Sequence, residues 1–320
     1  MNLIIKPDSK KYFIKVNIVN RIKEVDVIRL LAIVLVVFSH CFALFNGSWS
    51  NPNQDYISEI KSYTILTDFI SSFRMPAVVL VAGYIFMYFG QKRKQNLLNL
   101  VSIKFKRLIF PMLFFGILYL VIFNSYDVNQ FIRRLSAGPG HLWFLPMLFW
   151  NFLFGFYLIK IRNRYFQILI FFFLFVISGI SPYLPSLFSI SKAAQFLVYF
   201  YFGSILWQFR EYILNNFLNN SVLLVYFVLY LLIFVLFAVD KDGFFFSNEV
   251  FSGLFLLVVN IIGVFYFYLI IMYLIYNLHI YKIIQNVYIL PVFLFVVSLL
   301  GSIVLTYLFL KTRLGRYLIG

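Results

Sequence analysis

Charged side chains are scarce in this sequence: Asp, Glu, Lys and Arg together make up 12% of its 320 residues. A soluble domain has about 25% charged residues, which form the surface that it turns to water. Apolar residues instead make up 63% of the chain, and its mean hydropathy is +0.92. This shortage of charge excludes a soluble fold and predicts an all-α, polytopic integral membrane bundle.

Cysteine and histidine are almost absent. Cys41 is the single cysteine of the sequence, so neither an intramolecular disulfide nor a cysteine metal cluster can form. It adjoins His40, but neighbouring residues on a helix point about 100° apart, which argues against a nucleophile–base pair. Only three histidines occur, and none has a carboxylate at a metal-ligand spacing. We therefore expect no metal centre and no bound cofactor.

Acidic residues are also few, at 11 against 27 basic ones, and the net charge is +16. Such an excess can mark a nucleic-acid-binding protein. Here, however, the basic residues cluster beside apolar runs, as is typical of the cytoplasmic loops of membrane proteins. The charge distribution therefore predicts topology, with membrane lipids and no nucleic acid as partners.

Three segments are expected along the chain: a basic amino-terminal segment, a transmembrane domain and a short basic tail, which are 1–25, 26–310 and 311–320. The apolar run after residue 25 is too long for a signal-peptide core, and no small-residue cleavage site follows it. We therefore expect a cytoplasmic amino terminus and a multi-pass protein of a bacterial-type cytoplasmic membrane.

Nine apolar runs are long enough to cross a bilayer. These runs are 27–45, 63–89, 106–123, 142–159, 165–181, 193–209, 221–238, 251–277 and 287–310. The charges between them place 91–107 inside and both 46–62 and 239–250 outside. Nine spans would leave the basic tail outside, against the positive-inside tendency, so nine and ten spans both stay open.

The first apolar run contains an arginine and a histidine eleven residues apart, Arg29 and His40. Eleven residues make about three helical turns, so both side chains fall on one stripe, separated by a rise of about 16 Å. Ionisable groups inside a membrane usually face a cavity or a partner. The alternative is structural, with Arg29 reaching the headgroups and His40 capping the far end of the span.

Arg74 lies about eleven residues into the second run, so we expect it near mid-membrane and facing the bundle interior. Pro76 removes a backbone hydrogen bond there and can open a cavity. The structural alternative is an ion pair between Arg74 and Asp68.

Two further groups stand at the ends of the expected spans. Lys106 and Arg107 begin the third run, where a basic pair is either a topology anchor or a phosphate-binding site. Gly138-Pro139-Gly140 predicts a turn before the fourth run, which would place His141 and Trp143 at the outer interface. An aromatic ring beside a polar group suits sugar binding, although a tryptophan at an interface is common in any membrane protein.

Several of these motifs, in this order, resemble the acyltransferase family 3 integral membrane enzymes. The matching stretches are Arg29 with His40, Phe73–Pro76 with Gly83-Tyr84, Lys106–Pro111, His141–Leu145, Tyr199–Gly203 and Leu314–Gly320. Two departures occur: Ala82 stands where the family commonly has serine, and the region from Tyr281 to Pro291 lacks a histidine of the family's penultimate span.

The resemblance implies transfer of an acyl group, usually acetyl, from acyl-CoA to a hydroxyl of a surface polysaccharide of the cell envelope or its lipid-linked sugar precursor. Arg29, Lys106 and Arg107 would then bind the phosphates of the donor. His40 would be the general base and Arg74 would stabilise the oxyanion.

His141 and Trp143 would contact the acceptor. The alternatives are a transporter or flippase for a lipid-linked glycan, whose substrate path these cations would line, and an inactive relative that only binds the glycolipid. The sequence predicts no oligomeric state.

Overall fold

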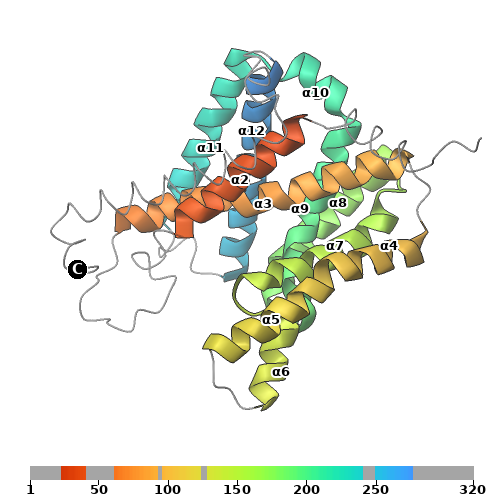
Figure 1. Ribbon diagram of the computed structural model, residues 1–320. Coiled ribbons are helices and arrows are strands. Elements are labelled where there is room, and N and C mark those ends of the chain that lie inside the picture. The colour runs from red at the N-terminus through yellow and green to blue at the C-terminus, as the bar shows by residue number, and fades with distance from the viewer. Residues whose placement is uncertain (1–22, 41–60, 93–95, 124–127, 241–248, 277–320) are drawn as a thin grey trace, which may run out of the picture.

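The computed structural model describes residues 23–40, 61–92, 96–123, 128–240 and 249–276 of the chain (Figure 1). Every regular element in this part is helical, with no strand among the described residues, which confirms the all-α prediction. The long helices are α2 (Lys23–His40), α3 (Lys61–Lys92), α5 (Phe110–Phe123), α7 (Phe144–Leu158), α8 (Arg164–Ile180), α9 (Ile190–Gln208), α11 (Asn220–Asp240) and α12 (Glu249–Tyr276).

Short helices connect them: α4 (Leu97–Lys104), the π-helical turn η1 (Phe105–Ile109), α6 (Val128–Ala137), α10 (Arg210–Asn216) and the 3₁₀ turn η2 (Gly140–Trp143).

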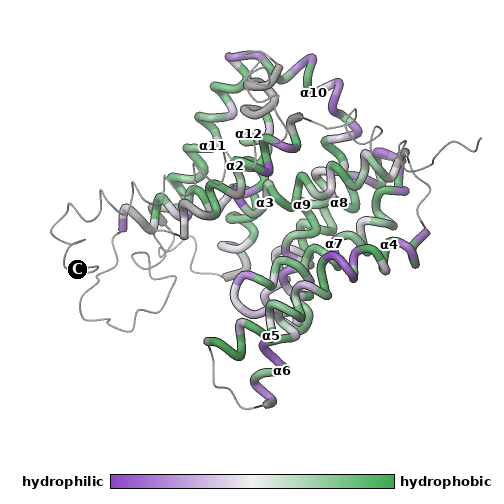
Figure 2. The backbone as a smooth tube through the Cα atoms, in the orientation of Figure 1, coloured by the Kyte–Doolittle hydropathy of each residue, from purple (hydrophilic) through white to green (hydrophobic). Residues whose placement is uncertain are grey.

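Six of the described helices are long and apolar enough to cross a membrane: Thr64–Gly90, Leu97–Ile122, Gly140–Leu158, Arg164–Tyr183, Asn220–Ala238 and Phe251–Leu269. Apolar residues run along nearly their whole length (Figure 2). The last expected span, 287–310, lies outside the described residues, as do most of the loop 46–62 and most of the loop 239–250. The count of nine or ten spans and the predicted orientation therefore stay predictions.

Helix α3 is the central element of the bundle and packs against α2, α7, α9 and α12 (Figure 1). Its closest neighbour is α9, because small residues let the two backbones meet. A Cβ atom on Gly83 would overlap the carbonyl group of Phe200, and one on Gly203 would overlap that of Leu80. Close approach of this kind is typical of small residues between membrane helices. The crossing of α3 and α9 therefore sets the positions of the helices around it.

The third span differs from the sequence prediction. The chain was expected to be a loop over 91–107 and a span over 106–123, but it is helical from Leu97 onwards. Asn96 caps this helix, because its side chain accepts a hydrogen bond from the Leu98 backbone N–H at 3.4 Å. Apolar residues continue through the basic stretch, so Lys106 and Arg107 lie inside a continuous helix instead of at its first turn.

A π-helical turn interrupts this helix at Phe105–Ile109, where the Phe110 backbone N–H donates to the carbonyl of Phe105, five residues back. Pro111 explains why the turn forms at this point. Proline has no N–H for the carbonyl of Arg107 four residues earlier, and its ring clashes with that carbonyl in a regular α-helix. A wider turn just before the proline relieves the clash, and such turns are often found at functional sites.

Candidate active site

Three basic side chains from two parts of the chain form a cationic cluster, which we define as Arg29, Lys104 and Arg107. Lys106, also predicted to bind the donor, is exposed on the same π-helical turn as Arg107, and its part in the site stays a prediction. Lys104 lies within electrostatic range of both Arg29, on α2, and Arg107, on η1. Arg29, Lys106 and Arg107 are exposed, whereas Lys104 is half-buried. The helices thus bring the predicted donor-binding residues Arg29 and Arg107 to one side chain, Lys104, which the sequence prediction had left out of the site.

Packing holds Lys104 in this cluster although its neighbours are also cations. Its Nζ atom lies 3.3 Å from the centroid of the Phe152 ring, on α7. A cation over an aromatic face is stabilised by the negative face of the ring. Asp26 offsets part of the charge of Arg29 on the same helix. The cluster still has more positive than negative groups, and such a site favours a polyanionic ligand.

Arg74 lies on α3, two residues before Pro76, and α3 continues past this proline. Its Nε and Nη1 atoms are buried, and neither has a hydrogen-bond partner among the described residues. The expectation that Arg74 faces the interior is thereby confirmed. The structural alternative, an ion pair with Asp68, is not made through either of these atoms. Buried guanidinium nitrogens without a hydrogen-bond partner are costly, especially in a membrane, so the position of Arg74 is a candidate for a functional role.

Hydrogen bonds surround α3 just before Arg74. The Ser72 Oγ and Tyr230 Oη atoms are 2.6 Å apart, which links α3 to α11. Because Pro76 has no N–H, the carbonyl of Ser72 is free of its usual helical partner. Asn260 of α12 replaces that partner: oriented to satisfy both of its neighbours, its amide nitrogen donates to the Ser72 carbonyl at 3.2 Å. The same amide is hydrogen-bonded to the hydroxyl of Tyr199 on α9.

This network fixes four helices around the turn of α3 that contains Arg74. Sequence reasoning missed it, since Ser72, Tyr199, Tyr230 and Asn260 are unremarkable residue types in separate spans. The one usable signal in the sequence was Pro76. It leaves the carbonyl four residues earlier without its helical N–H, and in a membrane such a carbonyl requires another hydrogen-bond donor.

His40 is the last residue of α2, and its side chain lies outside what the structure describes. The backbone from Arg29 to His40 is one uninterrupted helix, so the predicted spacing of about three turns is confirmed. The catalytic role of His40 stays a prediction.

The predicted turn before the fourth run is confirmed. Gly138 has a φ of 81° and Gly140 a φ of 58°, values that glycine adopts without strain. A Cβ atom on Gly138 would also lie 2.7 Å from the backbone of Trp143. This turn exposes His141 and half-buries Trp143, whose ring packs against Phe196.

The cationic cluster, Arg74 and the pair of His141 and Trp143 are therefore three separate groups on separate elements. Lys192 adds a further cation beside the third group, with its Nζ atom 5.8 Å from the centroid of the Trp143 ring. No three His, Cys, Asp or Glu side chains gather for a metal ion in the described part of the chain.

Comparison with known families gives one result. Residues 22–311 match the model of an acyltransferase family, described as an acyltransferase domain. The matched region includes the cationic cluster, Arg74, His40, His141 and Trp143. No curated protein and no solved structure matched the chain.

Proposed function

Since this chain belongs to the acyltransferase family whose domain it matches over residues 22–311, and is a multi-pass membrane protein, we propose that it transfers an acetyl group from acetyl-CoA to a sugar hydroxyl. The acceptor is a surface polysaccharide of the cell envelope or its lipid-linked precursor. The family gives acyl transfer in general, and the acetyl donor and the sugar acceptor are the proposed part.

The observation that supports the proposal most is Arg74. Its buried Nε and Nη1 atoms have no partner among the described residues, although Arg74 lies within the apolar segment Thr64–Gly90 of α3. A membrane protein that keeps such a group needs a compensating negative charge. In acyl transfer that charge appears on the carbonyl oxygen of the thioester as the hydroxyl attacks it. A prearranged donor at that oxygen stabilises the transition state more than the ground state.

The cationic cluster supports the choice of donor. Coenzyme A has a diphosphate and a further phosphate, and guanidinium groups bind phosphates through paired hydrogen bonds. The positive charges of Arg29 and Arg107 both repel that of Lys104, and a bound polyanion would offset this repulsion. A coenzyme with several phosphates can therefore interact with cations of α2, α4 and η1 together.

The reaction follows from these assignments. The acceptor oxygen bonds to the thioester carbon, and its proton passes to the neutral imidazole of His40. Arg74 stabilises the negative carbonyl oxygen of the tetrahedral intermediate. The carbon–sulfur bond then breaks, and the coenzyme leaves as a thiol after it receives the proton from His40. His141 and Trp143 contact the acceptor sugar.

The substitution His40→Gln tests the mechanism, because glutamine keeps a hydrogen-bonding group but cannot accept the proton at neutral pH. Acid–base assistance contributes roughly 10² to 10⁴-fold, so acetyl transfer by the purified variant should fall by about that factor. Its thermal unfolding midpoint should stay near that of the wild type. A variant that transfers acetyl at the wild-type rate would rule out His40, and His141 would be the next residue to test.

The acyl-ester content of the surface glycan, measured with and without the protein, tests the function itself. Loss of an acetyltransferase removes esters while the glycan still reaches the surface. Loss of a flippase would lower the amount of glycan instead. Cells that make the protein are compared with cells that lack it, and cells that make the His40→Gln variant are the matched control. Equal ester content in cells with and without the protein would contradict the proposed reaction.

A further inference from the structure

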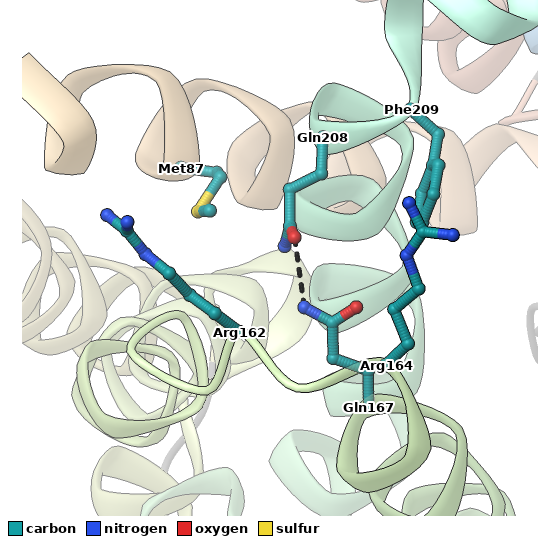
Figure 3. A pocket seen from close by; sticks show the side chains of 6 residues that line it. All are labelled: Met87, Arg162, Arg164, Gln167, Gln208 and Phe209. Atoms are coloured by element: carbon teal, nitrogen blue, oxygen red, sulfur yellow. Dashed lines mark hydrogen bonds between the residues drawn. The ribbon is translucent and has the colours of Figure 1, made fainter.

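A cavity of about 580 Å³ lies where the ends of α3 and α9 meet the start of α8 (Figure 3). Its lining side chains are Met87, Arg162, Arg164, Gln167, Gln208 and Phe209. None of them belongs to the cationic cluster or to the groups around Arg74 and Trp143. The cavity is therefore a separate candidate site.

Two guanidinium groups flank this cavity, and its lining includes no acidic residue. Neither Arg162 nor Arg164 is paired with a carboxylate within the part of the chain that the structure describes. The Arg164 guanidinium lies 5.5 Å from the centroid of the Phe209 ring, which restricts its position. The two guanidinium groups lie on opposite sides of the Gln167–Gln208 pair, so each supplies positive charge and planar donors to one side of the cavity (Figure 3).

The glutamines form a fixed floor between the arginines. Gln167 is 4% exposed, and its Nε2 atom donates both to the carbonyl of Ile161 and to Oε1 of Gln208, each at 2.9 Å. The amide oxygen of Gln208 is thus occupied, which leaves its own N–H groups available as donors in the cavity. A site with guanidinium and amide donors suits phosphate oxygens.

The setting of the cavity indicates where the phosphate comes from. Arg164 is the first residue of an apolar helix, and the side chains that follow it are exposed to the membrane: Tyr165, Phe166, Ile168 and Leu169. Arginines at such a boundary lie at the depth of the lipid headgroups. Basic pockets between transmembrane helices bind anionic lipid headgroups.

We propose that this cavity binds the headgroup phosphate of an anionic glycerophospholipid, with its acyl chains along the exposed face of α8. Arg162 and Arg164 supply the positive charge on the two sides of the anionic headgroup, and Gln208 donates a hydrogen bond to a phosphate oxygen. The bound lipid joins the ends of α3, α8 and α9.

Native mass spectrometry of the full-length protein in detergent tests this proposal. Phosphatidylglycerol and phosphatidylcholine with identical acyl chains are added in separate titrations. The wild-type protein should bind one phosphatidylglycerol at least tenfold more tightly than phosphatidylcholine. The R162Q/R164Q variant, which keeps polar side chains but loses both charges, should bind the two lipids equally.

The matched control is R133Q/R134Q, which removes the same charge from α6, a helix that does not line the cavity. It should bind phosphatidylglycerol within twofold of the wild type. If R162Q/R164Q bound phosphatidylglycerol more tightly than phosphatidylcholine by the same factor as the wild type, the proposal would be overturned.

Competition on the wild-type protein gives a test that needs no variant. Excess inorganic phosphate or coenzyme A should leave the bound phosphatidylglycerol in place, because neither has acyl chains that reach the face of α8. Displacement by either one would overturn the lipid assignment and identify a site for soluble phosphates. A wild-type protein that binds both lipids equally would also overturn it.

Discussion

The crossing of α3 and α9 and the cationic segment Lys104–Arg107 are both parts of apolar helices, but they differ in how closely they are packed. Within the span Thr64–Gly90 of α3, 67% of the residues in its most apolar window are buried, against 22% in Leu97–Ile122. The first region meets protein on most sides and its backbones touch at Gly83 and Gly203. The second has exposed cations and a π-helical turn. Apolar composition alone does not distinguish them.

This difference separates folding from ligand binding. At the crossing, large rings such as Tyr199, Phe200 and Tyr201 are buried to 2% exposure or less, so added volume has no free space. Along the cationic segment, side chains can change without disturbing close packing. Substitutions in the first region should therefore lower stability, and substitutions in the second should lower donor affinity.

The largest effect on stability is expected from Gly203→Ala. The new Cβ atom would overlap the backbone carbonyl of Leu80, and a backbone cannot move aside as a flexible side chain can. Separation of α3 and α9 should cost roughly 3 kcal/mol, near the upper end for overpacking. Thermal unfolding of the purified protein in detergent measures this loss.

Gly253→Ala on α12 is the matched control, because no atom lies within 4 Å of a Cβ at that position. Alanine favours a helix over glycine by roughly 0.5–1 kcal/mol, so this variant should be unchanged or slightly more stable. If the two alanine variants unfolded at the same temperature, the crossing would not be the tightly packed region described above.

The next effect concerns the cationic segment. Arg107→Gln removes one charge from the cluster at an exposed position. A hydrogen bond to a charged group contributes about 1.5–3 kcal/mol, so coenzyme A should bind roughly tenfold to a hundredfold more weakly. Added salt should reduce the wild-type affinity more than that of the variant. Isothermal titration calorimetry measures both affinities.

The unfolding midpoint of Arg107→Gln should stay close to the wild-type value, since the position is exposed and the change also relieves repulsion with Lys104. Arg133→Gln on α6 is the control for a general charge effect and should leave coenzyme A affinity unchanged. Weaker binding in both variants would show that the overall charge of the protein, and not the cluster, attracts the donor.

Sequence patterns predict the parts of this molecule that depend on local composition. The apolar runs give the helices, the turn before His141 follows from two glycines, and the inward position of Arg74 follows from its depth in an apolar run. The spacing of Arg29 and His40 needs only a continuous helix, which α2 provides. Each of these features is determined within one helix or one turn.

Contacts between distant segments could not be predicted in this way. Lys104 on α4 lies within electrostatic range of Arg29 on α2, and nothing in either local sequence specifies the other. The π-helical turn depends on Pro111, which the sequence contains, but the resulting shift of the span towards Leu97 was missed. The cavity between Arg162 and Arg164 also requires the ends of three helices to meet.

The smallest effect is expected from Tyr230→Phe, which removes a hydroxyl at the edge of the tightly packed region that contacts Ser72 Oγ and, at 3.5 Å, the Phe69 carbonyl. The hydroxyl of Tyr230 lies 2.6 Å from Ser72 Oγ, and phenylalanine keeps the ring contacts with Phe69 and Phe234. Hydrogen bonds between membrane helices contribute about 0.6 kcal/mol on average, so the loss of stability should be of that order.

Tyr212→Phe, at an exposed position, is the control and should not change the unfolding midpoint. Both variants should transfer acetyl at the wild-type rate, because Ser72 and Arg74 are on different sides of α3. A Tyr230→Phe protein with unchanged stability and a tenfold slower transfer would place this hydroxyl in the reaction site, and the separation of folding from ligand binding would then fail for α3.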